Sequence, residues 1–556
     1  MAYSIPDMSA FLNPHLCANT KRGVGGACQN DAALACSGCH LVQYCSKECQ
    51  IADRSYHKKT SFIGGAPLAP FGTRKFLWGN MPAIDMLNTN DHESEEELAN
   101  QNIELLFAAS GDLRNVVKTV VGLPESYGGE CTAVLNDKEL IIVARNAIML
   151  LIALYFDPEV SVPMIIHLWY SASIPGAMVQ ALQSHILPLV EEVCGKVKDK
   201  SAGSVQAKTF TINGRKLRVV LKKEEWFEFA KYFTVPKTLT ADEANVMRRR
   251  VTVAPERIDY RERAMLQWPG ALRLVDMNFR QEGVFLPFGC SLEAFDTPNP
   301  YNKWPMKDSS TPRDGWHHSE YMKYAPAAKE DEHGAVFFYV RSLLLKFCSR
   351  IRNLNISIQL SSVNAQNLGR YVRNLKFDRI EISNICDHGY LGPHECLQIF
   401  SSLLKSRSAN PKATLLVLFM NAAPETEHEH INKSPAKMRA SMELDRKRLE
   451  GYMPIDKAIF ATICNANDLG RHPDFVRRSG CNEMLKNWDQ WFETFKYETG
   501  FVQVAASCGL KTKGENTIIE AWPYTVRPET TKKELDVLRA SGTTGYERYL
   551  ELVKAE

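Results

Sequence analysis

Short apolar segments with strand character alternate with longer segments of helical periodicity between residue 76 and about residue 425. Strands that alternate with helices are joined by crossover connections, which favour a mostly parallel sheet covered by helices on both faces. The sequence therefore predicts a three-layer α/β core of Rossmann type over residues 76–425. We expect strands at 103–107, 131–135, 356–360, 377–385 and 413–421, helices at 140–156, 178–197 and 393–406, and a hairpin at 208–221.

Two regions with a different pattern flank this core. Residues 1–62 are rich in cysteine, and a linker of Gly and Pro residues follows at 64–70. Residues 426–556 are more polar, and we expect a mainly helical C-terminal region there. At about 150 residues per domain, a chain of 556 residues is expected to have about three or four structural units.

Composition excludes several classes of protein. Apolar residues make up 45% and charged residues 24%, which is ordinary for a globular chain and excludes a wholly disordered or fibrous one. The most apolar stretch, 140–156, contains Arg145 and Asn146, so it predicts a buried helix rather than a membrane span. Since the first ten residues do not look like a secretory signal, we expect a cytoplasmic protein with no membrane partner.

The cysteines of the N-terminal module have the spacing of metal ligands. Six of the 15 cysteines lie between positions 17 and 49, and His57 follows them. Closely spaced cysteine pairs supply two corners of a tetrahedral zinc site from one turn of chain. A module of this size buries too little apolar surface to fold alone, and a metal ion compensates for that. The ligand candidates are Cys17, Cys28, Cys36, Cys39, Cys45, Cys49 and His57.

This module resembles the MYND zinc finger, most closely in the run from Leu41 to Gln50. The resemblance implies one zinc site from Cys17, Cys28, Cys45 and Cys49, and a second from Cys36, Cys39, His57 and a final cysteine. Here Ser61 stands at that final position, so one or two structural zinc ions are expected. The first pair is also separated by ten residues where the usual finger has two. The resemblance implies a peptide partner rather than DNA, and a fold-stabilising role is the alternative.

Several runs within the core resemble one family. They are Trp78–Asp85, Phe107–Asn115, Leu135–Lys138, Val143–Asn146, Leu286–Gly289 and Phe377–Asn384. Together they are similar to a domain found in fungal MYND-finger proteins and in axonemal dynein preassembly factors. That family includes the fungal arginine-containing cyclodipeptide synthases of secondary metabolism. The resemblance implies an enzyme that takes amino acids from arginyl-tRNA and a second aminoacyl-tRNA and joins them into a diketopiperazine.

Two turns of the core are candidates for a substrate pocket. Gly111 and Asp112 follow the first predicted strand, and Asn136 and Asp137 follow the second. In a Rossmann sheet such turns lie side by side at the carboxyl edge, where ligands bind. A helix that begins there also offers free N–H groups to an anion. Plain turn chemistry is the alternative interpretation.

Asp378 and Glu381 are the candidate catalytic pair. With the implied substrate, Asp378 would hold the cationic group of an arginyl moiety, and Glu381 would be the base that frees the attacking amine. Residues three apart on a strand face opposite sides, so both acids reach one pocket only where the strand bends or ends. A salt-bridged strand end is the alternative. Ser110 and Ser383 are open candidates for a covalent aminoacyl intermediate.

A run of arginines in the middle of the chain is the candidate tRNA contact. Its members are Arg248, Arg249, Arg250 and Arg257. Such a patch binds phosphates without reading sequence. The alternative is a solvated helix, paired with neighbouring acids such as Glu256 and Glu262.

Three functions therefore follow from the sequence. The first is tRNA-dependent synthesis of an arginine-containing cyclic dipeptide. The second is a non-enzymatic adaptor or scaffold that docks peptides through its finger. The third is a methyltransferase-like enzyme that uses S-adenosylmethionine, although the first-strand turn lacks the expected glycine-rich run. The second amino acid of the product and the oligomeric state stay open.

Overall fold

The computed structural model describes most of the chain. The described residues are 16–19, 28–36, 42–60, 72, 76–236, 239–266, 268–301, 306–372, 375–432, isolated positions between 434 and 452, 481, 484–527, 529–540 and 544–556.

One large mixed sheet forms the centre of the described part of the chain, with the strand order β12-β13-β11-β10-β3-β4-β9-β7-β6. The six strands from β11 to β7 run parallel, whereas β13 and β6 are antiparallel to their neighbours. The strands are β3 Ile103–Phe107, β4 Glu130–Asp137, β6 Val205–Ile212, β7 Arg215–Lys222, β9 Asn355–Ser362, β10 Arg379–Glu381, β11 Thr414–Phe419, β12 Leu510–Thr512 and β13 Arg548–Lys554.

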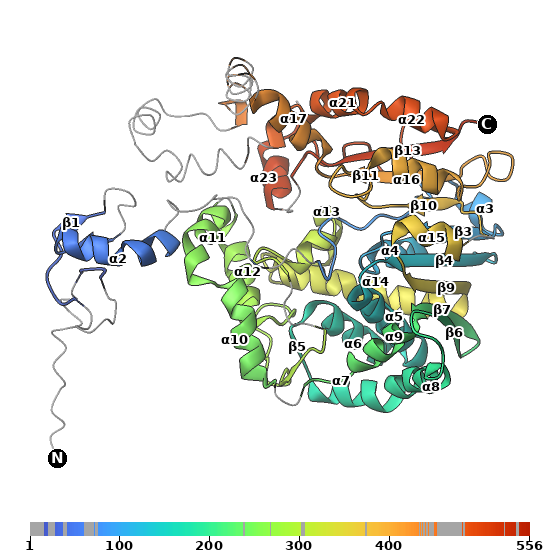
Figure 1. Cartoon of the computed structure of the whole chain (residues 1–556), viewed down its shortest axis with the longest axis horizontal. Coiled ribbons are helices and arrows are strands. Elements are labelled where there is room, and N and C mark those ends of the chain that lie inside the picture. The colour runs from blue at the N-terminus through green and yellow to red at the C-terminus, as the bar shows by residue number, and fades with distance from the viewer. Residues whose placement is uncertain are drawn as a thin grey trace.

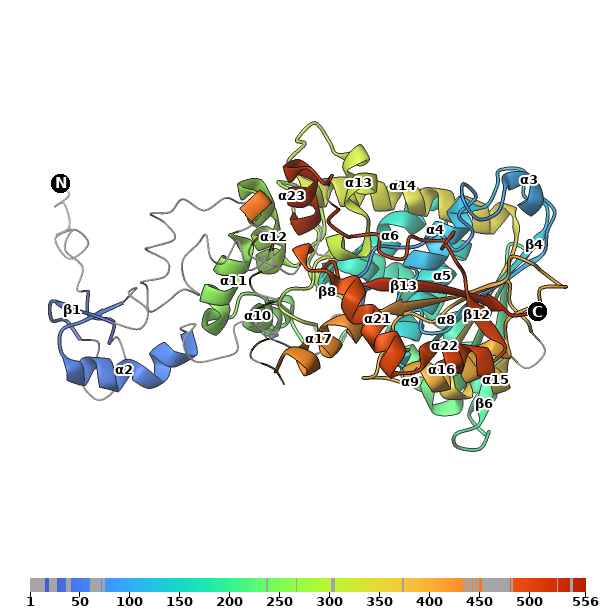
Figure 2. The ribbon, with the colours of Figure 1, turned by 90° about the horizontal axis from the view of Figure 1, so that it is seen from above.

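Both faces of the sheet are covered by helices, as the alternation of side chains along each strand requires. In β3, Leu105 and Phe107 pack into one apolar cluster and Leu106 packs into the other. Figure 2 shows α4 and α14 above the strands and α16, α21 and α22 below them. The first cluster includes α4 Arg114–Gly122, α5 Leu140–Tyr155, α6 Pro158–Tyr170, α8 Leu187–Val197, α9 Lys223–Lys231 and α14 Glu332–Asn353. The second includes α15 Leu368–Tyr371, α16 Gly392–Ser401, α21 Trp488–Glu498 and α22 Phe501–Ser507.

The predicted strands and helices of the core are present. The hairpin β6–β7 turns at Asn213 and Gly214, which both have positive φ, as its two-residue loop requires. The segment expected as one helix at 178–197 consists of α7 Gly176–Ala181, a π-helical turn at Leu182–Ile186, and α8. The strand expected at 377–385 is shorter, because β10 ends at Glu381.

The middle of the chain, where the sequence predicted few elements, is helical. Its helices are α10 Ala241–Thr252, α11 Ile258–Met265 and α12 Gly270–Glu282. Thr240 begins α10 with a capping box, since its hydroxyl accepts from the N–H of Glu243 and its own N–H donates to the Glu243 carboxylate. Pro255 and Pro269 interrupt the helical periodicity between these helices and hid them from the sequence pattern.

The C-terminal region contains helices, as expected, and also completes the sheet. Its helices include α17 Ala422–Asn432, α21, α22 and α23 Lys532–Ala540, while β13 pairs with β11 and β12 pairs with β13. The sequence did not predict these strands, because β13 begins at Arg548, ends at Lys554 and carries Glu551 between its apolar residues. The expected boundary at residue 425 therefore does not coincide with an edge of the sheet.

The N-terminal finger lies at one end of the molecule, beside α11 (Figure 1). It contains the two-stranded β1 Leu34–Ala35 and β2 Gln43–Tyr44, followed by α2 Lys47–Thr60. The remaining short elements are α3 Glu95–Leu98, β5 Ser173–Ile174, β8 Thr297–Pro298 and α13 His318–Tyr321. Among the described helices, none combines the length and the apolar character needed to cross a bilayer.

Because β13 belongs to the central sheet, its core residue Leu552 should stabilise the whole body. Leu552 is fully buried against the second apolar cluster. We expect Leu552→Ala to lower the free energy of unfolding by about 2–5 kcal/mol, measured by urea denaturation. The control is Tyr497→Ala, because the Tyr497 side chain is 87% exposed and its loss should cost little. An unchanged midpoint in Leu552→Ala would contradict this placement.

Candidate functional site

Four cysteine side chains of the finger converge on one point. The sulfur atoms of Cys17, Cys28, Cys45 and Cys49 all lie within 4.8 Å of one another. Cys45 Sγ is 3.7 Å from Cys17 Sγ, 3.6 Å from Cys28 Sγ and 3.5 Å from Cys49 Sγ. Zn–S bonds of about 2.3 Å in a tetrahedron separate the sulfur atoms by about 3.8 Å. The donor set therefore fits zinc, with Cys45 directly after β2 and Cys49 in the first turn of α2.

The second predicted zinc site is described only in part. Cys36 Sγ lies 3.5 Å from His57 Nε2, so the structure brings these two predicted ligands together. Cys39 and Ser61 lie outside the described residues. The helix that carries His57 is also held by a hydrogen bond of 2.9 Å from the Tyr44 hydroxyl to Asp53.

Asp112 is the centre of a buried polar cluster at the carboxyl end of β3. Its side chain is 2% exposed. It accepts hydrogen bonds from the N–H of Gly79 at 2.8 Å, from Arg114 Nε at 2.7 Å and from Trp169 Nε1 at 3.3 Å. A side chain on Gly79 would collide with the guanidinium of Arg114, so this approach needs glycine. The carboxylate of Asp112 therefore joins α4, α6 and the segment before α3.

The other three predicted pocket residues join the same cluster. The Asp137 carboxylate accepts from the N–H of Gly111 at 3.1 Å, and burial raises the pKa of Asp137 to about 6. The Asn136 amide donates to the carbonyls of Ala108 and Val363 at 3.0 and 2.8 Å. The structure thus brings the four residues together, as predicted. Their polar groups bond to one another and to the backbone, as in the alternative interpretation of turn chemistry.

Helix α5 contributes two buried polar side chains to this cluster. Asn146 donates to the carbonyl of Gly111 at 2.9 Å, and the buried Arg145 donates to the carbonyl of Leu77. Burial lowers the pKa of Arg145 to about 10. The two polar residues that interrupt the apolar run 140–156 are therefore the ones that face the carboxyl ends of β3 and β4.

The structure places Asp378 and Glu381 at opposite ends of β10. Asp378 precedes the strand and is 1% exposed. It accepts from the N–H of Glu104 at 2.8 Å, from Lys405 Nζ at 2.8 Å and from Asn410 Nδ2 at 2.7 Å. Although burial opposes ionisation, these three donors lower the pKa of Asp378. This geometry is that of a salt-bridged strand end, and it does not bring the two carboxylates into one pocket.

Glu381 ends β10 at the carboxyl edge, beside α4. Its carboxylate accepts from the N–H of Ser383 at 2.6 Å. Burial raises the pKa of Glu381 to about 7, against the opposing effects of the Ser383 N–H, of Arg114 and of Asn115. Of the predicted pair, Glu381 alone thus lies at the edge where ligands bind in parallel sheets. The candidate Ser383 lies next to it, with φ of 51°.

The predicted arginine patch divides into buried and exposed members. Arg248 is 2% exposed, and its guanidinium donates to the carbonyl of Arg280 at 2.6 Å and to Asn245 Oδ1 at 2.9 Å. It therefore joins α10 to the end of α12. Arg257 bonds to Asp308 at 3.0 Å. Arg249 and Arg250 have exposed side chains that a phosphate could reach, and Arg249 also donates to the carbonyl of Gln281 at 2.7 Å and pairs with Glu282 at 3.4 Å.

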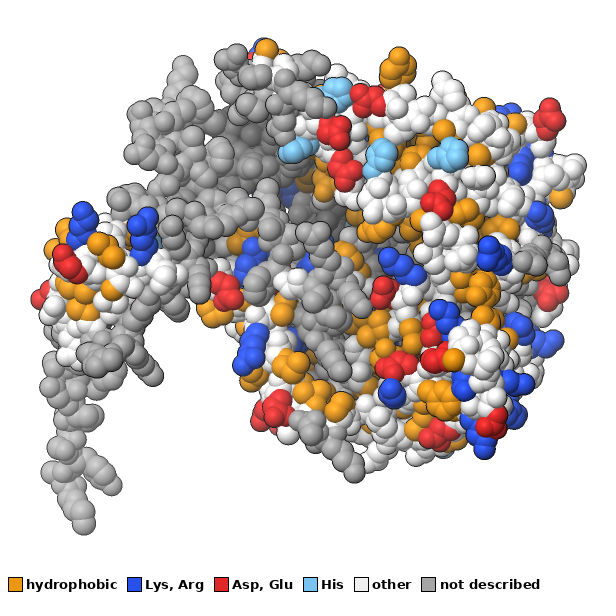
Figure 3. All heavy atoms as spheres, in the orientation of Figure 1, with side chains coloured by type: hydrophobic (Ala, Val, Ile, Leu, Met, Phe, Trp, Pro, Cys, Tyr) orange, Lys and Arg blue, Asp and Glu red, His pale blue; other side chains and the backbone are white. Residues whose placement is uncertain are grey.

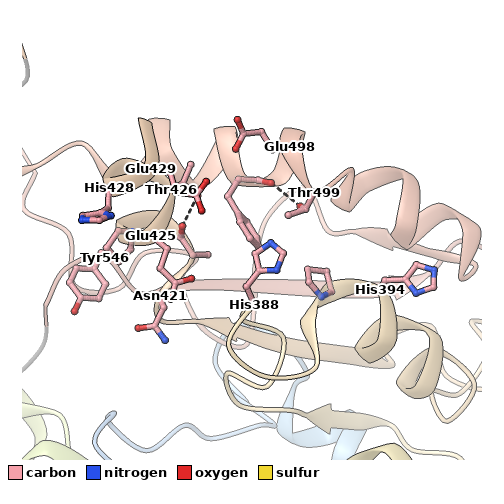
Figure 4. Close-up of a pocket in the computed structure, with 14 residues that line it drawn as sticks. His388, His394, Asn421, Glu425, Thr426, His428, Glu429, Glu498, Thr499 and Tyr546 are labelled. Atoms are coloured by element: carbon pink, nitrogen blue, oxygen red, sulfur yellow. Dashed lines mark hydrogen bonds between the residues drawn. The ribbon is translucent and has the colours of Figure 1, made fainter. Parts of the chain in front are cut away.

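A surface cavity of about 850 Å³ lies at the carboxyl end of β11. Histidines and acidic residues gather over α17 and α21 in the upper part of Figure 3. Figure 4 shows His388, from the loop after β10, facing side chains of α17 and α21. The charged and imidazole side chains that line the cavity are His388, His394, Glu425, His428, Glu429 and Glu498.

The floor of the cavity is fixed by a buried carboxylate. Asp387 accepts from the N–H groups of Met420 and Asn421, both at 3.1 Å, and so joins the loop after β10 to the end of β11. Burial raises the pKa of Asp387 to about 6. On the rim, Glu498 pairs with His430 Nε2 at 2.8 Å, whereas Glu425 and Glu429 form no ion pair with any other described residue. The cavity therefore offers negative charge to a cationic ligand.

The sequence analysis did not identify this cavity. Its residues come from four separate segments, between His388 and Tyr546, that only the fold brings together. A partial signal is the alternation of acid and imidazole in the run from Glu425 to His430.

Two family models match the chain. Residues 17–60 match the MYND finger, and residues 77–174 match a domain described as a domain of unknown function (DUF4470). No curated protein and no solved structure matches it. The first match agrees with the cysteine cluster, so the N-terminal module is a MYND-type zinc finger and its ion is zinc. The second match includes β3, β4 and α5, which build the buried polar cluster around Asp112.

Zinc binding can be measured directly. Elemental analysis of the purified full chain should find at least one zinc ion per molecule. Cys45→Ser should lose that ion, because it removes one corner of the tetrahedron. Cys290→Ser is the matched control, since Cys290 is exposed and distant from the finger in sequence. Equal zinc content in both variants would contradict the ligand set.

The raised pKa of Glu381 predicts a pH-dependent effect on stability. Below the unfolded-state pKa, near 4.3, the group is protonated in both states. As the pH rises towards 7, only the unfolded chain ionises freely, so wild-type stability falls across this window. Glu381→Gln should remove that loss. Its free energy of unfolding relative to wild type should rise by a few kcal/mol between pH 4 and pH 8 in urea denaturation. A difference that is constant with pH would rule out the shifted pKa.

Proposed function

We propose that the chain is an aminoacyl-tRNA-dependent enzyme that forms an arginine-containing cyclic dipeptide. The observation that carries the proposal is the acidic cavity at the carboxyl end of β11, lined by Glu425, Glu429 and Glu498. A guanidinium group is large, cationic and rich in donors, and carboxylates are its preferred partners in proteins. This cavity therefore suits the arginyl side chain that the sequence resemblance implies.

The strand order supports a Rossmann-type arrangement of the catalytic body. β3 lies at the centre of the parallel strands, with β4 and β9 on one side and β10 and β11 on the other. In doubly wound sheets, ligands bind outside the carboxyl ends of the strands, near the point where the strand order reverses. The loops after β10 and β11, which carry His388 and Asn421, end at this edge and line the cavity.

The proposed reaction needs a leaving group, which the tRNA ester of each substrate provides, and a base, which the protein must provide. The α-amino nitrogen of one aminoacyl group attacks the ester carbonyl of the other, an amide bond forms, and the ester C–O bond breaks. The amine gives up a proton and the departing tRNA hydroxyl takes one. A second attack of the same kind closes the ring and releases the second tRNA. The imidazoles of His388 and His428, which line the cavity, would accept and return the proton.

The other residues predicted from the sequence would serve in tRNA binding or in holding the sheet together. Arg249 and Arg250 would contact phosphates of the tRNA, since their side chains are exposed on α10. Glu381 lies at the same carboxyl edge but does not line the cavity, so we assign the proton transfers to the imidazoles. Asp378, which is bonded to Lys405 and Asn410, would act only by holding β10 in place. Charged tRNA is a cytoplasmic substrate, so we place the protein there.

The adaptor function is a second candidate, because one observation favours it. The finger exposes Leu34 and Ile51 at 50% and 60%, at the end of the molecule away from the sheet (Figure 1). Exposed apolar side chains on a zinc-stabilised module suit a peptide partner. The S-adenosylmethionine hypothesis ranks lower, because Asp112 and Asp137 at the expected nucleoside site are bonded within the chain.

Product analysis tests the enzymatic proposal. Yeast that expresses the full chain should accumulate an arginine-containing diketopiperazine, detected by mass spectrometry of the extract. Glu425→Gln and Glu429→Gln together should lower the yield at least about tenfold, because two partners of the guanidinium lose their charge. Glu493→Gln is the matched control on α21, since its exposed carboxylate pairs with Lys496 and does not line the cavity.

Two different failures can be told apart. Soluble wild-type protein with no arginine diketopiperazine in the extract would contradict the function. Normal yield from the cavity variant would leave the function in place and contradict only the assignment of the arginyl group to this cavity.

A further inference from the structure

A second, smaller cavity lies in the helical middle of the chain. It has a volume of about 200 Å³ and is enclosed by α11, by α12 and by the segment 308–314. At about 30 Å³ per water molecule, this volume holds on the order of six waters, which is sufficient for a phosphate group and a few further atoms. Three guanidinium groups line it, from Arg261, Arg280 and Arg313.

Two of these arginines are held by acids of the surrounding helices. Arg280 Nε bonds to Asp276 at 2.6 Å, and Arg313 bonds to Glu332 at 3.2 Å. Arg313 also lies over the ring of Trp268, at 5.2 Å from its centroid. These contacts fix the direction of both guanidinium groups and leave part of each facing the cavity.

Arg261 is different, because its ion pair is long and its partner is exposed to solvent. The residue is 7% exposed, and its buried Nε atom forms no hydrogen bond within the described part of the chain. The nearest carboxylate is that of Glu262 at 3.8 Å, and this acid is 59% exposed to solvent. A buried cation without hydrogen-bond acceptors is costly. Its position at the wall of the cavity gives it access to an acceptor that would occupy that space.

The side chains that line the cavity favour an anion, because the three arginines Arg261, Arg280 and Arg313 share the lining with only two carboxyl groups, those of Asp308 and Asp314. Arg257 is not part of the lining, and it neutralises one of these carboxylates through its bond to Asp308 at 3.0 Å. The acids that face the arginines of the site are Glu262, Asp276, Asp308, Asp314 and Glu332. Burial raises the pKa of Asp314 to about 7, which reduces the opposing negative charge near neutral pH. His333, packed behind the site, stays neutral because burial lowers its pKa to about 4.

We propose that this cavity binds the phosphate group of a small ligand, with Arg261 as the residue that makes the main new contacts. Arginine recognises phosphate through paired N–H donors, and several guanidinium groups around one cavity match its tetrahedral oxygens. The site is separate from the acidic cavity over α17 and α21. The inference therefore does not depend on the proposed enzymatic function.

Thermal unfolding of the full chain in inorganic phosphate tests the proposal. At about 100 times the dissociation constant, phosphate should raise the Tm by a few degrees above the value in chloride of the same ionic strength. Arg261→Gln should abolish this rise and weaken phosphate binding at least about tenfold in calorimetry. Its Tm in chloride should stay close to that of wild type, because the ion pair that is removed, with the exposed Glu262, is long and screened by solvent.

Arg273→Gln is the matched control, since Arg273 is an exposed residue of α12 and lies outside the cavity lining. It should keep the full response to phosphate. A further titration with glycerol phosphate distinguishes the two sources of the group. A larger rise than with inorganic phosphate identifies a phosphorylated metabolite, and an equal or smaller rise identifies free phosphate. No rise in wild type, or the same rise in Arg261→Gln, would overturn the proposal.

Discussion

The buried carboxylate of Asp112 is the interaction on which the arrangement of the core depends. It holds the N–H of Gly79, the guanidinium of Arg114 and the indole of Trp169 around the carboxyl end of β3. Breaking a buried ion pair on one side leaves an uncompensated charge, which typically costs about 3–5 kcal/mol. Three segments far apart in sequence thus meet at one oxygen pair. Their positions in turn fix α4 and α6 against the sheet.

This bonding divides the carboxyl edge of the sheet into two parts. Around β3 and β4 the polar groups of Gly111, Asn136 and Asp137 are used by the chain itself. At the end of β11 the edge is open, and acidic and imidazole side chains line a surface cavity with a volume of about 850 Å³. The closed part supplies rigidity, and the open part carries the negative charge and the imidazoles that the proposed reaction would use.

The sequence predicts those features that depend on residues close together along the chain. The cysteine pairs indicated the zinc site, apolar runs indicated strands such as β11, and Asn213-Gly214 indicated the hairpin, because each signal lies within a few residues. It was uninformative where partners are distant. No residue close to Asp378 in the sequence indicates that Lys405 and Asn410 will bond to it. The acidic cavity, the sheet partner of β13 and the burial of Arg248 likewise depend on contacts that only the folded chain creates.

The central claim is that the acidic cavity recognises a guanidinium group, and its most direct test is a comparison of two ligands. Arginine amide and citrulline amide have nearly the same shape, and only the first carries the side-chain charge. Isothermal titration of the wild-type chain should show arginine amide binding at least about tenfold more tightly, because charge-assisted hydrogen bonds to Glu425 and Glu429 are available to it alone. Equal affinity for the two amides, or binding of neither, would contradict the account.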